Sequence, residues 1–252
     1  MKVRPGVEVA GLTDIGCQRE NNEDNYAYWE SEDEAIYQRL GRLAIVADGM
    51  GGAEGGQHAS RIAVDTVRDL YSAPGEDAPQ EKLTAAFGEA NARVQQEARE
   101  NPALRGMGTT LTACALVGQQ LYYAHIGDSR LFLIRAGQAQ QLSQDHSLVA
   151  RLIAAGSLRP EDAESHPQRN VLTAAIGVMD EVQPDCPAKP VSLQSGDALV
   201  LCTDGLWGQV SALEMAEVLE KQSVEAGARA LVTLAKQRGG PDNITLQVLR
   251  IS

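Results

Sequence analysis

The sequence predicts a layered α+β fold, and three observations support that prediction. The chain has 252 residues, of which 43% are hydrophobic and 22% charged, so it can bury a sizeable core. Several short strand-like segments follow one another in the middle of the chain. Helix-like segments arrive in pairs before and after them, so we expect sheets with helices packed against them.

The predicted strands are short runs of mainly apolar residues bounded by turn residues. In chain order they cover residues 7–13, 42–47, 109–117, 120–126, 130–135, 198–202 and 243–251. The predicted helices carry apolar residues at helical spacing. They cover residues 59–71, 80–100, 147–155, 212–221 and 223–238. Gly118 and the turn at Gly127 join the three central strands, which are therefore expected to pair antiparallel.

The least regular stretches are residues 28–39, 73–79 and 157–169, where apolar residues follow neither the spacing of a strand nor that of a helix. No repeat, low-complexity tract or long linker divides the chain. We therefore expect residues 1–252 to form a single domain.

The charge of the chain argues against several classes of partner. Asp and Glu number 34 against 22 Lys and Arg, which gives a formal net charge of −12. This field repels nucleic acid and anionic lipid headgroups, so we expect neither as a partner.

There is no apolar signal core and no apolar run near the ~20 residues that cross a bilayer. The four cysteines are too far apart for a C-x-x-C signature and are expected to be free thiols, and we expect a cytoplasmic protein.

Two similar motifs place an aspartate after an apolar strand. They are VADGMGG (46–52), which contains Asp48, and LCTDGLW (201–207), which contains Asp204. Taken alone, Asp-Gly is an ordinary way to end a strand. In the functional interpretation the strand fixes the carboxylate, and the glycines let backbone carbonyls approach a hard cation.

Three further acidic segments complete the set of candidates. Asp242 lies in a turn before the last predicted strand, and Asp128 lies between two central strands. The charged run RENNED (19–24) follows the first strand, where a solvated loop is the default interpretation. Clustered carboxylates select magnesium, manganese or calcium over zinc, and two such ions can clamp the oxygens of a phosphoryl displacement. Two-metal hydrolysis of phosphate esters is compatible with these motifs, although spacing alone does not bring them together.

The ordered set of motifs resembles that of bacterial metal-dependent protein phosphatases of the protein phosphatase 2C type. The set is RENNED (19–24), DGMGG (48–52), GTT (108–110), GDSR (127–130), DH (145–146), DG (204–205) and GPDN (240–243). It runs from about Val9 to Val248. The resemblance implies a four-layer α-β-β-α sandwich, with two antiparallel sheets flanked by helix pairs and a metal centre at one end.

The resemblance also implies a set of metal ligands for two to three Mn²⁺ or Mg²⁺ ions. Asp48 would bridge two ions, and the Gly49 carbonyl would bind one of them. Asp204 and Asp242 would complete the other. Asp128, together with Asp204, would supply a third site.

Further residues are implied to support the reaction. Glu23 and Asp24 would hold metal-bound waters, and Arg19 would grip the substrate phosphate as a bidentate cation. Asn243 and Thr110 are expected to support these groups. Arg19 here, with Asp48 and Asp204 above, would carry catalysis: a metal-bridging water would attack phosphoserine or phosphothreonine directly, in opposition to a cognate Ser/Thr kinase.

Two departures from the family pattern bear on mechanism. Animal relatives have a histidine, a proposed proton donor, where this chain and bacterial relatives have methionine, Met50. A metal-bound water is therefore the preferred donor, with His125 and His146 assigned to packing or hydrogen bonding. Many bacterial relatives have arginine at the position of Ala174, a change expected to affect substrate choice.

Residues 147–170 correspond to the flap beside the active site and are expected to form a mobile lid.

Three other functions fit the sequence less well. An inactive scaffold that binds phosphoproteins or metals would not need the three strand-end aspartates. A related hydrolase that acts on regulators of sigma factors usually carries sensor domains, and none is visible. A structural calcium-binding protein would need a ligand spacing like that of an EF-hand loop, which DGMGG does not supply.

Overall fold

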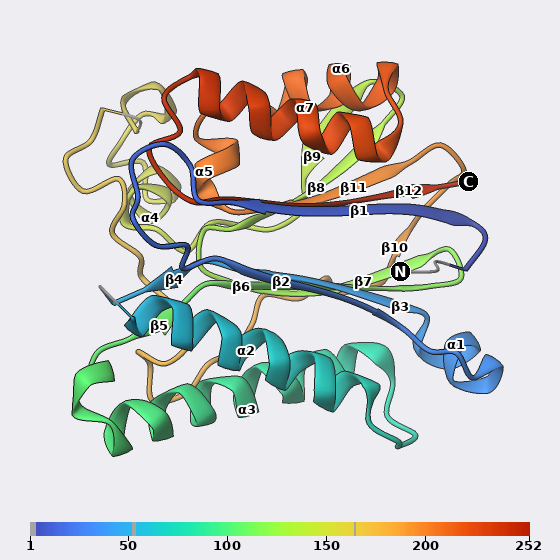
Figure 1. Cartoon of the computed structure of the whole chain (residues 1–252), viewed down its shortest axis with the longest axis horizontal. Helices are drawn as coiled ribbons and strands as arrows, with labels where there is room; N and C mark the ends of the chain where they lie inside the picture. Colours follow the sequence, from blue (N-terminus) through green and yellow to red (C-terminus); the bar gives the residue numbers. More distant parts are fainter. Residues whose placement is uncertain (1–3, 52–53, 164) are drawn as a thin grey trace.

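Two antiparallel five-stranded sheets pack face to face in the computed structural model, which describes residues 4–51, 54–163 and 165–252 (Figure 1). In order across it, the first sheet contains β1 (Val7–Asp14), β12 (Ile244–Ile251), β11 (Ala198–Cys202), β8 (Arg130–Arg135) and β9 (Gln138–Gln141). The second contains β10 (Val191–Ser192), β7 (Gln120–Ile126), β6 (Leu111–Val117), β3 (Arg42–Ala47) and β2 (Asn25–Glu30).

A helix pair covers the outer face of each sheet. Helices α2 (Gly55–Ser72) and α3 (Pro79–Glu100) lie on the second sheet, and α6 (Ala212–Lys221) and α7 (Val224–Gln237) lie on the first (Figure 1). The shorter elements are α1 (Glu34–Leu40), α4 (Leu148–Ala154), α5 (Asp204–Trp207) and the paired strands β4 (Gly49–Met50) and β5 (Gly108–Thr109). The predicted four-layer sandwich is confirmed. In the described ranges, no helix combines the length and the apolar character needed to cross a membrane.

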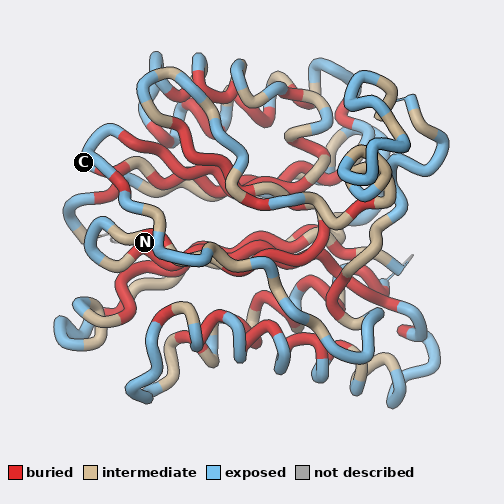
Figure 2. Tube along the Cα trace, turned by 180° about the vertical axis from the view of Figure 1, so that it is seen from behind, coloured by how far each residue is buried: buried red, intermediate tan, exposed pale blue. Residues whose placement is uncertain are grey.

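Strand alternation divides the core into three layers of buried side chains. In β3, Leu43 and Ile45 pack toward α2 and α3, whereas Ala44 and Val46 pack between the sheets. The buried segments therefore run through the middle of the molecule, and the outer helix faces are exposed (Figure 2). Polar contacts also cross the middle layer: the fully buried Gln247 of β12 donates to the carbonyls of Ala27 and Ile45 in the other sheet.

The register brings the motif-bearing strand ends to one end of the sandwich. Ala47 at the end of β3 pairs with Asn25 at the start of β2. In the other sheet, Cys202 at the end of β11 pairs with Leu246 near the start of β12. The residues just beyond these four strand ends therefore lie near one another.

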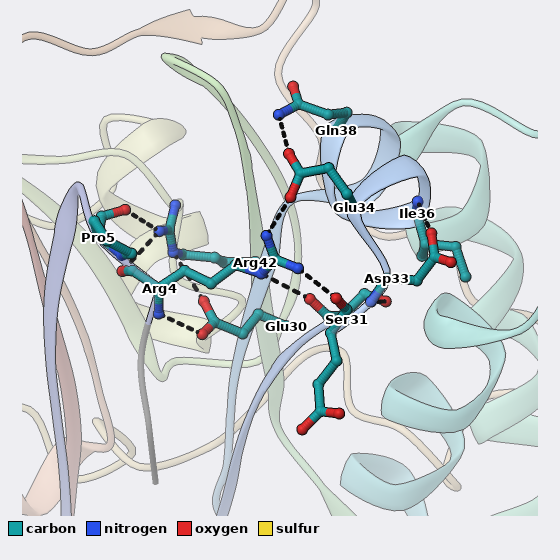
Figure 3. A network of polar contacts seen from close by, with 10 residues as sticks. Arg4, Pro5, Glu30, Ser31, Asp33, Glu34, Ile36, Gln38 and Arg42 are labelled. Atoms are coloured by element: carbon teal, nitrogen blue, oxygen red, sulfur yellow. Dashed lines mark hydrogen bonds and ion pairs between the residues drawn. The ribbon is translucent and has the colours of Figure 1, made fainter.

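The prediction that residues 28–39 are irregular is wrong. They contain the end of β2 and all of α1 except its last residue, Leu40, and Asp33 caps α1 by accepting from the Ile36 amide at 3.0 Å. The pattern was hidden because β2 is an edge strand whose residues are all half-buried. A polar network fixes this region: Glu30 accepts from the Arg4 amide at 2.7 Å and from the Arg42 guanidinium at 3.1 Å (Figure 3).

The expected antiparallel pairing across Gly127 is also wrong. Strands β6 and β7 pair as predicted, but β7 and β8 belong to different sheets, so residues 127–129 cross from one sheet to the other. Spacing could not distinguish this crossover from a hairpin. Residues 109–117 divide into β5 and β6, and Asp204 begins the short helix α5 rather than a simple turn.

Candidate functional site

A cavity of about 570 Å³ lies at the end of the sandwich to which the register brings the strand ends. Eight of the ten predicted site residues line it: Arg19, Glu23, Asp48, Gly49, Thr110, Asp128, Asp204 and Asp242. Asp24 and Asn243 are buried and do not line it. Gly52, the last residue of the DGMGG motif, lies outside the described residues.

Asp48 follows the fully buried strand β3, and its backbone is fixed on both sides. Its amide donates to the Thr110 hydroxyl at 2.9 Å. Its carbonyl accepts from the Thr110 amide at 2.9 Å and from the Thr109 hydroxyl at 2.9 Å. This cross-bracing sets where the carboxylate enters the cavity and gives Thr110 a supporting position.

Gly49 lies where no side chain fits. A Cβ built at Gly49 would lie 2.1 Å from the Gly56 carbonyl oxygen and 2.6 Å from the Glu23 carbonyl oxygen. The Gly49 amide donates to that same Glu23 carbonyl at 3.2 Å. The glycine therefore allows three segments of backbone to meet beside Asp48.

Two buried carboxylate oxygens lack a partner. Asp24 accepts from the Thr203 hydroxyl at 2.8 Å through one oxygen, Oδ2. Its other oxygen, and one oxygen of Asp204, have no hydrogen-bond partner among the described residues. Buried polar atoms are rarely left in this condition unless an ion, a water or a reacting group serves them.

The electrostatics of the cluster favour a bound cation. Burial first, and then repulsion from neighbouring carboxylates, raises the pKa of Asp24 and Asp128 to about 7 and that of Asp204 to about 6. Burial, and then repulsion from Asp24 and Asp204, raises the pKa of Asp48 well above its ordinary value. A divalent cation among these oxygens would remove that repulsion, and an all-oxygen set suits Mn²⁺ or Mg²⁺.

One carboxylate of the cavity is engaged in an ion pair. Within the described residues, no three Asp, Glu, His or Cys side chains are already arranged as a metal-binding group. Asp242 is instead paired with Arg19, with 2.6 Å between Nη2 and Oδ2. The oxygen donors that line the cavity fit a divalent metal ion by their chemistry.

Asn243 joins the loop after β1 to the turn before β12. Its side-chain oxygen accepts from the Glu23 amide at 2.8 Å, and its side-chain nitrogen donates to the carbonyls of Ile15 and Asn21. Its own amide donates to Asp242 at 2.8 Å. It thereby holds two of the predicted acidic segments side by side.

The turn that carries Asp128 is supported by residues that we did not single out from the sequence. The Trp207 indole donates to the Asp128 carbonyl at 2.9 Å. The Arg130 guanidinium lies 3.5 Å from the centre of the Trp207 ring and pairs with Asp145 at 2.7 Å. Arg130 and Asp145 belong to the quoted GDSR and DH motifs, so the signal was present without a role attached to it.

His125 and His146 lie outside the cavity, in line with their assignment to packing and hydrogen bonding. His125 is fully buried, and its ring nitrogens lie 2.8 Å from the Thr112 hydroxyl and 3.0 Å from the Gly127 carbonyl. Burial lowers the pKa of His125 to about 4, so the ring is neutral at pH 7. His146 pairs with Asp185 at 3.0 Å.

Apolar side chains also line the cavity, a feature that the sequence patterns did not predict. Five side chains, which we call the apolar wall, belong to it: Met50, Leu172, Ala174, Val178 and Met179. Four of them come from residues 172–179, a stretch without a regular helix or strand. The spacing of apolar residues in this stretch does not indicate which of its side chains are exposed.

Comparison with known proteins gives consistent results at the level of family, sequence and structure. A family model described as protein phosphatase 2C matches residues 17–241. The protein phosphatase PhpP of Streptococcus pneumoniae is 39% identical over 250 residues, which cover 98% of each chain. The serine/threonine phosphatase stp of Listeria monocytogenes is 37% identical over 239 residues, or 93% of this chain and 92% of that one.

Solved structures agree with this chain over nearly its whole length. The serine/threonine phosphatase of S. agalactiae superposes with a TM-score of 0.89 at 35% identity, over 98% of this chain and 100% of that one. The catalytic domain of the serine threonine protein phosphatase PstP, solved in complex with two manganese ions, superposes with a TM-score of 0.84 at 33% identity, over 98% of each chain.

Proposed function

The chain belongs to the protein phosphatase 2C family and is a serine/threonine protein phosphatase that uses divalent metal ions, and we propose that its reaction takes place in the cavity at the end of the sandwich. The convergence of the acidic motifs carries this proposal. Asp48, Asp128, Asp204 and Asp242 come from four separate segments and line one cavity together with Arg19.

The proposed metal centre holds two to three Mn²⁺ or Mg²⁺ ions. Asp48, the Gly49 carbonyl, Asp204 and Asp242 would hold two of them, and Asp128 would contribute to a third. The partnerless oxygen of Asp204 and the repulsion among the carboxylates support this assignment. When bound, such ions neutralise charge on the phosphoryl group and lower the pKa of water.

The protein's own residues would position the substrate and the water. The Arg19 guanidinium is half-exposed at the cavity and can hold two phosphate oxygens in its planar fork. Glu23 and the buried Asp24 would orient water. The described residues that line the cavity include no histidine, and the Met50 thioether has no proton to give. We propose that water, not a side chain, protonates the departing oxygen.

We further propose that residues 1–252 act as one catalytic domain with a flap at residues 147–170. Asn170, the last residue of this segment, lines the cavity, and none of the residues of α4 is fully buried. A Ser/Thr kinase would supply the phosphorylated proteins on which the enzyme acts.

The test is hydrolysis of para-nitrophenyl phosphate and of a phosphothreonine peptide in the presence of Mn²⁺. Asp204→Asn should remove activity on both substrates, because it removes a charge from the centre. The matched control is Asp65→Asn, on the exposed side of α2, which should keep wild-type activity. If the wild-type protein with Mn²⁺ releases phosphate from neither substrate, the scaffold function replaces this proposal.

A further inference from the structure

We propose that the apolar wall is a subsite for an aliphatic side chain that flanks the phosphoserine or phosphothreonine of the substrate. The inference rests on the proposed function and adds to it a preference for a class of substrate sequence. Three observations carry it: the exposure of the wall, the anchoring of its backbone and its continuity with the acidic side of the cavity.

Exposed apolar side chains concentrate at this wall. Among the described residues only five large hydrophobic side chains are exposed: Ile15, Val171, Val178, Met179 and Leu213. Three of the five lie within residues 171–179, and Val178 is the most exposed of all at 61%. Val178 and Met179 also line the cavity. Grouped exposure of this kind marks binding surfaces, whereas single exposed apolar residues are ordinary.

The backbone beneath the wall is firmly anchored. Ile176 is fully buried and pairs with Thr109 through two main-chain hydrogen bonds of 3.0 and 2.9 Å. The side-chain amide of the buried Asn91 in α3 accepts from the Gly177 amide at 2.7 Å and donates to the Met179 carbonyl at 3.0 Å. Gln95 donates to the same carbonyl. The exposed side chains thus project from a fixed main chain, which lowers the entropy lost on binding.

The wall continues directly into the catalytic part of the cavity. A Cβ built at Gly108 would lie 2.7 Å from a methyl carbon of Val178 and 3.5 Å from the terminal methyl of Met50. Both side chains therefore lie beside Gly108, which pairs with Met50 between β4 and β5. Met50 is only two residues from Asp48, so the apolar surface adjoins the acidic one.

The chemistry of the cavity selects the occupant. Arg19 is the only Lys or Arg among the described residues that line it, and the carboxylates of Glu23, Asp48, Asp128, Asp204 and Asp242 line the same cavity as the wall. With the phosphate held by Arg19 and by the metal ions of the proposed centre, a neighbouring residue of the peptide can reach the apolar wall of the same cavity. An acidic neighbour would meet the repulsion of this cavity and of a chain with net charge −12, whereas an aliphatic one buries apolar surface.

The reference substrate is a phosphothreonine peptide whose flanking residues are all glycine. Each test peptide replaces a single one of these glycines by Leu, Lys or Glu, at one of the three positions before or the three positions after the phosphothreonine. With Mn²⁺ present, we expect Leu in at least one position to raise kcat/KM by about tenfold over glycine, as expected for an apolar subsite. Lys or Glu in that position should give no such gain.

Variants then assign the gain to the wall. The double variant Val178→Ser, Met179→Ser should bring the ratio of Leu to Gly peptides close to one, and Val178→Ile should keep the ratio. Leu213→Ser, at an equally exposed apolar residue on α6, is the matched control and should keep the wild-type ratio. Thermal unfolding of each variant checks that it is folded.

Two results overturn the subsite: no gain from Leu at any position, or a full gain that survives the double serine variant. Failure of the proposed function is a different result. In that case the wild-type protein would hydrolyse none of the peptides, including the peptide with glycine flanks.

Discussion

Arg19 has two anionic partners: its guanidinium forms an ion pair with Asp242 in this structure, and we propose that it also binds the substrate phosphate. A guanidinium can satisfy a phosphate with two parallel hydrogen bonds, whereas an ammonium is a single point charge. We expect Arg19→Lys to lower kcat/KM for a phosphothreonine peptide by about tenfold, and Arg19→Ala to lower it further.

Steady-state kinetics with Mn²⁺ held at saturation would measure these losses. Arg105→Lys and Arg105→Ala are the matched controls, since Arg105 is exposed and does not line the cavity. Equal activity of the wild type and Arg19→Ala would show that the phosphate is held elsewhere.

At the scale of elements, the turn between β6 and β7 and the crossover from β7 to β8 each contain one glycine, Gly118 and Gly127, whose substitutions can be compared. Both Gly118 and Gly127 have positive φ, +58° and +108°. A Cβ at Gly118 meets nothing within 4 Å, but one at Gly127 would lie 2.6 Å from the Thr110 side chain. Gly127→Ala should therefore cost about 1–3 kcal/mol more free energy of unfolding than Gly118→Ala.

Urea denaturation of the two variants, with the slopes compared, would measure this difference. Equal losses would mean that backbone conformation alone, and not the contact with Thr110, sets the cost. Gly127→Ala should also lower activity, because the same turn carries Asp128.

The elements also show how far sequence could predict this protein. In buried strands such as β3 and long helices such as α3, the apolar residues show a clear pattern along the sequence, so the sequence predicts both. The half-buried edge strand β2 has no such period, and the crossover at Gly127 depends on pairing partners remote in sequence. In the site, Asp48 and Asp204 stand out because each follows a buried strand. The apolar wall does not, since its orientation depends on hydrogen bonds from α3 that no local pattern records.

At the scale of the whole molecule, the acidic cluster sets how stability depends on pH. An unfolded aspartate has a pKa near ~3.9, whereas burial raises the pKa of Asp24 and Asp128 to about 7 and of Asp204 to about 6. Between these values the folded chain holds more protons than the unfolded chain. The free energy of unfolding of the metal-free protein should therefore fall as pH rises from about 4 to about 7.

His125 acts in the opposite direction, because burial lowers its pKa to about 4 and its contribution is lost as pH falls below about 6.5. The four carboxyl groups with a raised pKa, Asp48 included, outweigh one imidazole, so the free energy of unfolding falls on balance as pH rises. Thermal unfolding of chelated protein across this range would show the trend, and Asp128→Asn should flatten it. Added Mn²⁺ should raise Tm more at pH 7.5 than at pH 5. A Tm that rises steadily with pH without metal would contradict this account.

The proposed metal ligands belong to both halves of the sandwich. Asp48 and Gly49 follow β3 of one sheet, whereas Asp204 and Asp242 flank β11 and β12 of the other. An ion bound by these groups would connect the two sheets at the end of the sandwich where the cavity lies. The ion would have to dissociate before the two sheets could separate. Metal binding should therefore slow the unfolding rate of the whole chain as well as shift its equilibrium. In that case the lifetime of the folded enzyme in the cell would depend on the supply of the ion that it uses for catalysis.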